Sequence, residues 1–399
     1  MSFVAQRLHA IKPSPTLAVT AKAARLKAEG KDIIGLGAGE PDFDTPQFIK
    51  DAGIAAINKG MTKYTATGGT PSLKKAIIAK FKRDNNLNYT EKQILVSCGG
   101  KQSCFNLCMS VLGHGDEVII PAPYWVSYPD MVLMADGTPV FIAAGIEQGF
   151  KITPAQLAAA ITPKTKMIIL NSPSNPSGAV YTRSELAALG EVLRKHPNIL
   201  IATDDMYEHI LLDGSKFVNI LDACPDLYPR TMVLNGVSKA YSMTGWRIGY
   251  CGGPEEIIAA MESVQSHSTS NPSSISQYAA EIALNGDQSC INPMVAAFKE
   301  RGTYVAKALN AIPGVKCPGA AGAFYVFPDC RGAIAHLRQA GKISAATDLA
   351  LCDYLMAQPE AVAAVPGSAF GMQGYLRISF TTSMQNLEKA VARMAKAMA

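Results

Sequence analysis

The stretch Gly236-Val-Ser-Lys-Ala-Tyr-Ser-Met-Thr-Gly-Trp-Arg-Ile-Gly249 decides how this 399-residue chain is interpreted. It places one lysine, Lys239, beside the hydroxyl of Ser238 and eight residues before Arg247. An arginine presents a planar fork of donors that matches a phosphate group. A single lysine is most often a solvated surface charge, so a chemical role for Lys239 requires partners elsewhere in the chain.

The chemistry of a lysine amine indicates which ligand this stretch would hold. An amine contributes to catalysis chiefly by condensing with a carbonyl group. An aldehyde cofactor such as pyridoxal 5'-phosphate then supplies an electron sink that no side chain provides. Gly236 and Ala240 leave room for a flat ring, and Gly245 allows a tight backbone before Arg247. The stretch therefore predicts a lysine-bound pyridoxal phosphate whose phosphate lies near Ser238 and Arg247.

The composition is that of a globular protein with more than one domain. Hydrophobic residues make up 48% of the chain and the net charge is only +5, which argues against disorder. No dense Lys/Arg block with interleaved aromatic residues indicates a nucleic-acid partner. No apolar run reaches membrane-spanning length, and the start of the chain lacks a signal-peptide core. We expect a cytoplasmic protein without a membrane or nucleic-acid partner.

Cysteine and histidine patterns do not predict a metal centre. The nine cysteines form no CxxC pair, and the six histidines form no HxxH or HExxH arrangement. Reduced thiols and no bound metal are the expectation.

Several polar residues lie in loops that follow predicted strands. A buried strand from Ile94 runs into a glycine turn at residues 99–100 and then into a helix that continues to Leu112. Such a turn presents free N–H groups at the positive end of a helix, which favours a phosphate. Predicted strands also end at Leu170, just before Asn171, at Asp204 and at Asn235. Open α/β sheets bind ligands at these carboxyl ends.

The order of the motifs resembles one family along essentially the whole chain. The Lys239 stretch is similar to the lysine-attachment signature of class I and II aminotransferases, which are pyridoxal phosphate enzymes of fold type I. The other matching stretches are AGEPDFDTP (38–46), TKY (62–64), GGKQ (99–102), PYWVSYP (123–129), NSPSNPSGAVY (171–181), DDMYEH (204–209), GAFYV (322–326) and LRIS (376–379). They look most like the bacterial aspartate aminotransferases of subgroup Ib, also called Iγ.

The resemblance implies an α/β fold. Residues 49–290 would form a large cofactor-binding domain with a mostly parallel seven-stranded sheet between helices. Residues 291–399 would form a smaller α+β domain, joined by part of residues 1–48, which also supply an N-terminal arm.

The resemblance also implies the cofactor site. Lys239, Asp204 and Tyr207 would be the catalytic residues, with Asp204 beside the pyridine nitrogen and Asp205 as the alternative acid. The residues implied to bind the cofactor are Lys239, Gly100, Lys101, Gln102, Trp125, Asn175, Asp204, Tyr207, Ser238, Arg247 and Tyr64. Trp125 would stack on the ring, while Asn175 and Tyr207 would share its phenolic oxygen. Tyr64 would reach the phosphate of a neighbouring subunit, which implies a homodimer with its active sites at the interface.

The implied reaction is transamination between L-aspartate and 2-oxoglutarate, with prephenate as a second substrate. The residues implied to bind the substrate are Gly39, Trp125, Asn175, Arg377 and Lys12. The turn at residues 267–273 carries no arginine for a distal carboxylate, so Lys12, Lys101, Ser14 or Thr16 would have to bind it. Aromatic or alanine-type aminotransferases and a pyridoxal phosphate β-lyase remain alternatives. The glycines before Glu40 do not indicate a dinucleotide site, because the order is GxGxG and Glu-Pro-Asp follows.

Overall fold

The structure, a computed structural model, describes residues 3–11, 13 and 15–399. Lys12 and Ser14, both considered above for the distal carboxylate, lie outside the described residues. Within the described residues, no helix combines the length and the apolar character that a membrane crossing requires.

A sheet of seven strands forms the centre of the molecule, in the order β2-β8-β7-β6-β5-β3-β4. Strand β8 runs antiparallel to both of its neighbours, and the other neighbouring pairs are parallel. The strands are β2 (Ile94–Ser97), β3 (Glu117–Ala122), β4 (Thr138–Ala143), β5 (Thr165–Asn171), β6 (Leu200–Asp204), β7 (Thr231–Gly236) and β8 (Gly249–Gly252). The predicted mostly parallel sheet is confirmed.

Helices cover both faces of this sheet because its strands are apolar on both sides. Met167 and Ile169 of β5 pack into one core, while Ile168 and Leu170 pack into another, as expected from the two-residue period of a strand. The first core is completed by α4 (Gly100–Val111), α5 (Ser127–Met134) and α9 (Glu255–Ser266). The second is completed by α2 (Gln47–Asn58), α3 (Pro71–Asn85), α6 (Pro154–Ala160), α7 (Arg183–Arg194), α8 (Ile220–Ala223) and α10 (Ser274–Asn285).

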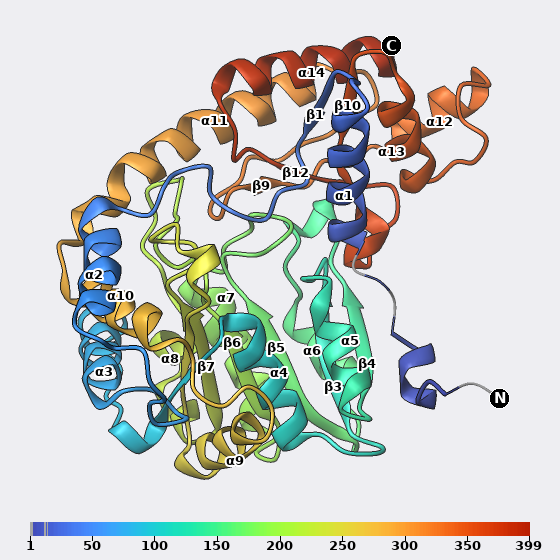
Figure 1. The fold of residues 1–399 in the computed structure, drawn as a ribbon. Helices are drawn as coiled ribbons and strands as arrows, with labels where there is room; N and C mark the ends of the chain where they lie inside the picture. The colour runs from blue at the N-terminus through green and yellow to red at the C-terminus, as the bar shows by residue number, and fades with distance from the viewer. Residues whose placement is uncertain (1–2, 12, 14) are drawn as a thin grey trace.

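The two ends of the chain come together in a second, smaller unit. In Figure 1, α1 (Pro15–Ala28) and β1 (Ile33–Gly35), both blue, lie beside the last elements (red), above the large sheet. Strand β1 pairs with β10 in parallel, and β11, β12 and β9 form an antiparallel sheet. The elements are α1 (Pro15–Ala28), β1 (Ile33–Gly35), α11 (Asn292–Asn310), β9 (Tyr325–Val326), α12 (Arg331–Gln339), α13 (Asp348–Ala357), β10 (Ala361–Ala363), β11 (Val365–Pro366), β12 (Leu376–Ser379) and α14 (Met384–Met398). We therefore propose the domain division into residues 1–48, 49–290 and 291–399.

Short 3-10 segments connect these elements. They are η1 (Gln6–His9), η2 (Glu91–Gln93), η3 (Ile146–Gln148), η4 (Pro225–Arg230), η5 (Thr244–Trp246), η6 (Gln288–Ile291) and η7 (Gly367–Phe370).

Local sequence signals explain where the helices begin. Helix α3 starts after Thr70, whose side chain accepts from the N–H of Leu73, and Pro71 occupies the first helical position. Helix α1 begins at Pro15, because a proline is pre-organised for the first turn.

Candidate active site

The carboxyl ends of β5, β6 and β7 face a cavity of about 470 Å³. Elements far apart in the sequence contribute to its wall, from α1 at one end of the chain to β12 at the other. The residues of the wall that were predicted for the site are Gly39, Gly100, Lys101, Trp125, Asn175, Asp204, Tyr207, Ser238, Lys239, Arg247 and Arg377. Strand ends and small-domain elements thus meet in one place.

Lys239 lies in the loop after β7 and reaches the substrate loop predicted around Gly39. Its Nζ donates to the carbonyl oxygen of Gly39 over 2.6 Å. Burial lowers the pKa of Lys239 to about 8, Glu40 opposes this shift, and the charges of Arg247 and Arg377 add to it. The amine is therefore closer to its neutral, nucleophilic form than an ordinary lysine.

The two neighbouring acids after β6 have different surroundings. Asp204 lines the cavity, and burial raises its pKa while hydrogen bonds from Tyr128 and the Met206 N–H lower it. Asp205 instead accepts from the Thr203 hydroxyl at 2.5 Å and from the Asn219 amide at 3.1 Å. Burial raises the pKa of Asp205 to about 8. Because Asp205 lies outside the cavity wall, the alternative assignment of the ring acid to Asp205 is wrong.

A tight backbone crossing brings Arg247 to the start of α4. Gly99 has a φ of +92°, and a Cβ there would lie 2.4 Å from the Arg247 guanidinium. Arg247 itself adopts a left-handed φ of 56°, which is uncommon outside glycine and often marks a functional site. The first N–H groups of α4, those of Gly100 and Lys101, have no carbonyl within the helix to receive them. The geometry forms an anion cradle with Ser238 at its side.

Gln102 is not part of this cradle. Its N–H donates to the Gly99 carbonyl, its side-chain oxygen accepts from the Cys98 N–H, and its amide donates to Thr269. The prediction for Gln102 fails because the side chain turns back to cap the strand-to-helix turn. Lys101 does face the cavity, with Nζ 5.1 Å from the centre of the Trp125 ring. Burial and the nearby Arg247 lower the pKa of Lys101.

Arg377 is a buried cation that pairs with no protein carboxylate among the described residues. Its guanidinium donates to the Gly37 carbonyl at 2.7 Å and to the Asn175 side-chain oxygen at 3.1 Å. It lies between two aromatic rings, 4.6 Å from that of Tyr325 and 5.1 Å from that of Phe370. Its Nε is buried without a partner in the described part of the chain. A buried positive charge with an unused donor favours an anionic ligand.

Tyr64 lies away from the cavity. Its side chain is 92% exposed, and it is absent from the wall of this chain's own site. Its predicted contact with a neighbouring subunit stays a prediction.

Comparisons with known proteins agree along the whole chain. The sequence profile described as Aminotransferase class I and II matches residues 31–394. The chain belongs to this family. The aminotransferase is 67% identical over 392 residues to the aspartate/prephenate aminotransferase of Nitrosomonas europaea, covering 98% of each chain.

Solved structures are also similar over the whole length of the chain. The aspartate aminotransferase from Rhizobium meliloti superposes with a TM-score of 0.94 at 49% identity, over 100% of this chain and 99% of that one. The Thermus thermophilus aspartate aminotransferase with maleate has a TM-score of 0.91 at 40% identity and full coverage of both chains. The predicted fold type and the predicted enzyme class are confirmed.

Three further residues of the aminotransferase's site are not predicted from the sequence. Asn171 donates to the Asp204 carbonyl at 2.9 Å, and its side-chain oxygen accepts from the Asn175 N–H. Tyr325 places its hydroxyl 3.1 Å from that of Tyr207, and Tyr128 contacts Asp204. All three lie inside motifs quoted above, but the sequence does not reveal that their side chains point toward the site.

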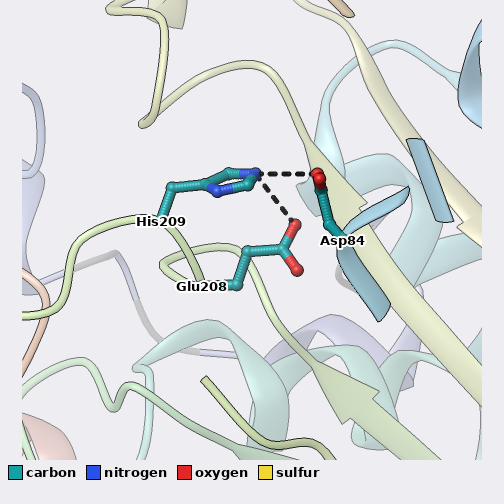
Figure 2. Close-up of side chains that lie close together, drawn as sticks. All are labelled: Asp84, Glu208 and His209. Carbon is teal, nitrogen blue, oxygen red and sulfur yellow. Dashed lines mark ion pairs between the residues drawn. The ribbon is translucent and has the colours of Figure 1, made fainter. Parts of the chain in front are cut away.

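A cluster of charged side chains around the buried Glu208 lies outside the wall of the aminotransferase's cavity. Figure 2 shows Asp84, Glu208 and His209 pointing toward one another, with His209 Nε2 3.5 Å from Asp84 and 3.4 Å from Glu208. Lys80 forms a buried ion pair with Glu208. Burial opposes ionisation, but the charge of Lys80 lowers the pKa of Glu208 to about 2. Glu208 also accepts from the amide of Asn235 on β7 at 2.7 Å, so the cluster ties α3 to the strand that leads to Lys239.

Proposed function

We propose that this aminotransferase uses pyridoxal 5'-phosphate to interconvert L-aspartate and 2-oxoglutarate with oxaloacetate and L-glutamate, and that it also aminates prephenate to arogenate. One observation carries the proposal: the desolvated amine of Lys239 opens into the same cavity as the acid Asp204 and the unpaired cation Arg377. The Nitrosomonas europaea relative is named for both aspartate and prephenate, which supports both substrates.

The residues of the cavity fit this cofactor. The cradle around Gly99, Gly100 and Arg247 has the cationic and N–H donors that a phosphate requires. Asp204, at the end of β6, offers a partly buried carboxylate for a ring nitrogen. Trp125 supplies an aromatic face beside Lys101. A Cβ at Gly99 would collide with Arg247, so the close approach depends on glycine.

Each residue has a defined task. When bound, pyridoxal phosphate supplies the carbonyl for amine exchange and an electron sink for the bond broken at the substrate's α-carbon. Lys239 would hold the cofactor through its amine, and the same amine would move the α-proton of the substrate as general base and acid. The lowered pKa of Lys239 suits both roles at neutral pH.

Asp204 and the pair Asn175 and Tyr207 would act on the ring from different elements. An ionised Asp204 keeps a ring nitrogen protonated, because opposite charges in a partly buried site attract strongly. The Asn175 oxygen accepts from Arg377, which leaves its NH₂ group as the donor for a phenolic oxygen. Tyr207, held by Tyr325, offers its hydroxyl to the same oxygen.

Two cationic groups would hold a dicarboxylate substrate. Arg377 captures the α-carboxylate in a bidentate arrangement, and Lys101 with Thr16 on α1 binds the distal carboxylate. The Thermus thermophilus structure was solved with maleate, itself a dicarboxylate. The Trp125 ring and the loop at Gly39 would restrict the substrate from two sides, which favours one orientation of its α-hydrogen.

We include a homodimer and a cytoplasmic location in the proposal. Tyr64 is exposed and lies outside the cavity of its own chain, which supports a contact with the phosphate site of a second subunit. The nine cysteines are all unpaired, which suits a reducing compartment.

A donor and acceptor panel tests the substrates. The purified enzyme is loaded with pyridoxal phosphate and assayed with aspartate, alanine, phenylalanine and tyrosine against 2-oxoglutarate, and with prephenate against aspartate and glutamate. Aspartate with 2-oxoglutarate and prephenate as acceptor should give the largest kcat/KM values. Preference for alanine or an aromatic donor would overturn the specificity, and pyruvate release without an oxo-acid acceptor would indicate a lyase.

A further inference from the structure

Tyr128 is buried directly behind the acid of the site. It lies near the start of α5, is 2% exposed, and donates its hydroxyl to Oδ2 of Asp204 over 2.5 Å. Its ring meets the Trp125 ring edge-on, with centroids 5.2 Å apart. One side chain thus contacts both the acid and the aromatic residue of the cavity wall.

The surroundings of Asp204 make this hydrogen bond important. The carboxylate is partly buried and contacts Tyr128, which belongs to an apolar core, and an unpaired charge in such surroundings is costly. Its other oxygen accepts only a long bond, 3.3 Å, from the N–H of Met206. The hydroxyl of Tyr128 is therefore the strongest donor to the carboxylate in the described part of the chain.

The other titratable groups that face Asp204 do not replace this donor. Cys104 on α4 has its pKa raised by its hydrogen bond with Cys108 and by burial, and Tyr207 after β6 has its pKa raised by burial, so both groups keep their protons beside Asp204. Lys239 after β7 favours the ionised carboxylate from across the cavity. Burial also raises the pKa of Tyr128 itself, so its hydroxyl keeps the proton that it donates.

We propose that Tyr128 is a positioning residue that holds Asp204 ionised and fixes its orientation toward the ring nitrogen of the cofactor. This inference rests on the proposed function, since it assumes that a pyridine ring occupies the cavity. Tyr128 does not touch the reacting atoms. It acts through Asp204. Its edge-on contact with the Trp125 ring also fixes the position of the Asp204 carboxylate relative to the face of that ring.

Cofactor binding to the cofactor-free protein tests the inference without any turnover. The variant Tyr128→Phe removes only the hydroxyl. It is compared with wild type for pyridoxal phosphate and for the 1-deaza analogue, in which a C–H group replaces the ring nitrogen. Loss of one hydrogen bond to a charged group should raise the dissociation constant of pyridoxal phosphate about tenfold. The analogue has no nitrogen for Asp204, so its dissociation constant should change less than about twofold.

The pH dependence gives a second readout. Without the Tyr128 hydroxyl, protonation of Asp204 becomes easier, so the acid limb of pyridoxal phosphate affinity should move to higher pH by about one unit. Tyr228→Phe is the matched control, because the Tyr228 hydroxyl also donates a short bond, 2.6 Å to the Asn88 carbonyl, away from the cavity. The Tyr228→Phe variant should leave the dissociation constant of pyridoxal phosphate and the acid limb of its pH dependence unchanged.

The outcomes are distinct. An equal loss of affinity for both ligands, or an unshifted acid limb, would show that Tyr128 acts only in packing and would overturn the inference. Failure of wild type to bind pyridoxal phosphate would instead overturn the proposed function. If Tyr128→Phe unfolds, Tyr128→His, which retains a ring donor, replaces it and should preserve more of the preference for the ring nitrogen than Tyr128→Leu.

Discussion

The guanidinium of Arg377 donates to the side-chain oxygen of Asn175 over 3.1 Å, and this bond joins β12 of the small unit to the turn after β5 of the large sheet. The guanidinium that would bind a substrate carboxylate is therefore the same group that orients the Asn175 amide. Under the proposed function, occupancy of the substrate site and the hydrogen bond from Asn175 to the cofactor ring would therefore be coupled through these two side chains.

Arg377→Lys should lower kcat/KM for aspartate about 100-fold, mostly through KM. Lysine keeps the charge but loses the two-pronged donor and the stacking between Tyr325 and Phe370. Truncating one partner of a buried charge pair costs roughly 2 to 5 kcal/mol. Steady-state kinetics with aspartate and 2-oxoglutarate measure the loss.

Arg301→Lys is the matched control for that substitution. Arg301 also stacks on two rings, those of Phe43 and Phe298, but it pairs with Asp42 and lies outside the cavity. Its effect on kcat/KM should stay below about threefold, since a partly exposed pair contributes about 1 kcal/mol or less. Comparable losses in both variants would refute a substrate-binding role for Arg377.

Lys239→Ala should lower kcat by at least about 1,000-fold, because both the covalent attachment and the proton carrier disappear. Adding an amino acid should no longer shift the cofactor absorbance. Lys239→Arg, which retains the positive charge, should be equally inactive. Reduction with borohydride and peptide mapping should label Lys239 in wild type, and a label at another lysine would contradict the assignment.

The sequence predicts the fold well because each strand is a short apolar run that ends in a polar loop. The amino-acid pattern alone places Asp204, Lys239 and Asn175 together, since the carboxyl ends of parallel strands share one edge of the sheet.

The sequence does not determine the direction in which each side chain of the site points. Gln102 follows the glycine turn as Lys101 does, yet its amide caps Cys98 while Lys101 faces the cavity. Asp204 and Asp205 are adjacent and chemically identical, but successive residues at a strand end point to opposite sides. Tyr128 and Asp204 are 76 residues apart, so no local pattern could pair them.

Tyr64 should act on the site of the other subunit. Tyr64→Phe should raise the dissociation constant of pyridoxal phosphate about tenfold, through loss of one hydrogen bond to a charged group. A mixed dimer of Tyr64→Phe and Lys239→Ala chains would then contain one intact site, with Lys239 from the first chain and Tyr64 from the second. At limiting cofactor it should be more active than either parent dimer. No recovery on mixing would show that Tyr64 works within its own chain.

The buried pair of Lys80 and Glu208 should be sensitive to removal of either partner. Lys80→Met leaves Glu208 charged in the interior and should lower the free energy of unfolding by about 3 to 5 kcal/mol. The double variant Lys80→Met, Glu208→Leu should recover much of this loss. Urea unfolding measures both, and equal stability of Lys80→Met and wild type would exclude the pair as a stabilising contact.

The same pair predicts in which direction the free energy of unfolding changes with pH. The pKa of Glu208 in the folded chain is about 2, below the ordinary value of 4.5. Its contribution to stability is present above pH 4.5 and is lost as the pH falls through 2. Glu208→Gln should therefore flatten the acid side of the stability curve measured by urea unfolding. A curve parallel to that of wild type down to the acid transition would contradict the shifted pKa.

In the cofactor-free enzyme, Lys239 should titrate near pH 8 instead of its ordinary 10.5. Between these pH values the unfolded chain binds more protons at this residue than the folded chain does, so the stability of wild type should rise with pH relative to Lys239→Met. Labelling by trinitrobenzenesulfonate, followed by peptide mass spectrometry, should give a midpoint near 8 for Lys239. The amine of Lys396, 81% exposed, serves as the internal control for the labelling reaction itself. A midpoint for Lys239 near its ordinary 10.5 would mean that burial beside Arg247 and Arg377 does not activate the amine.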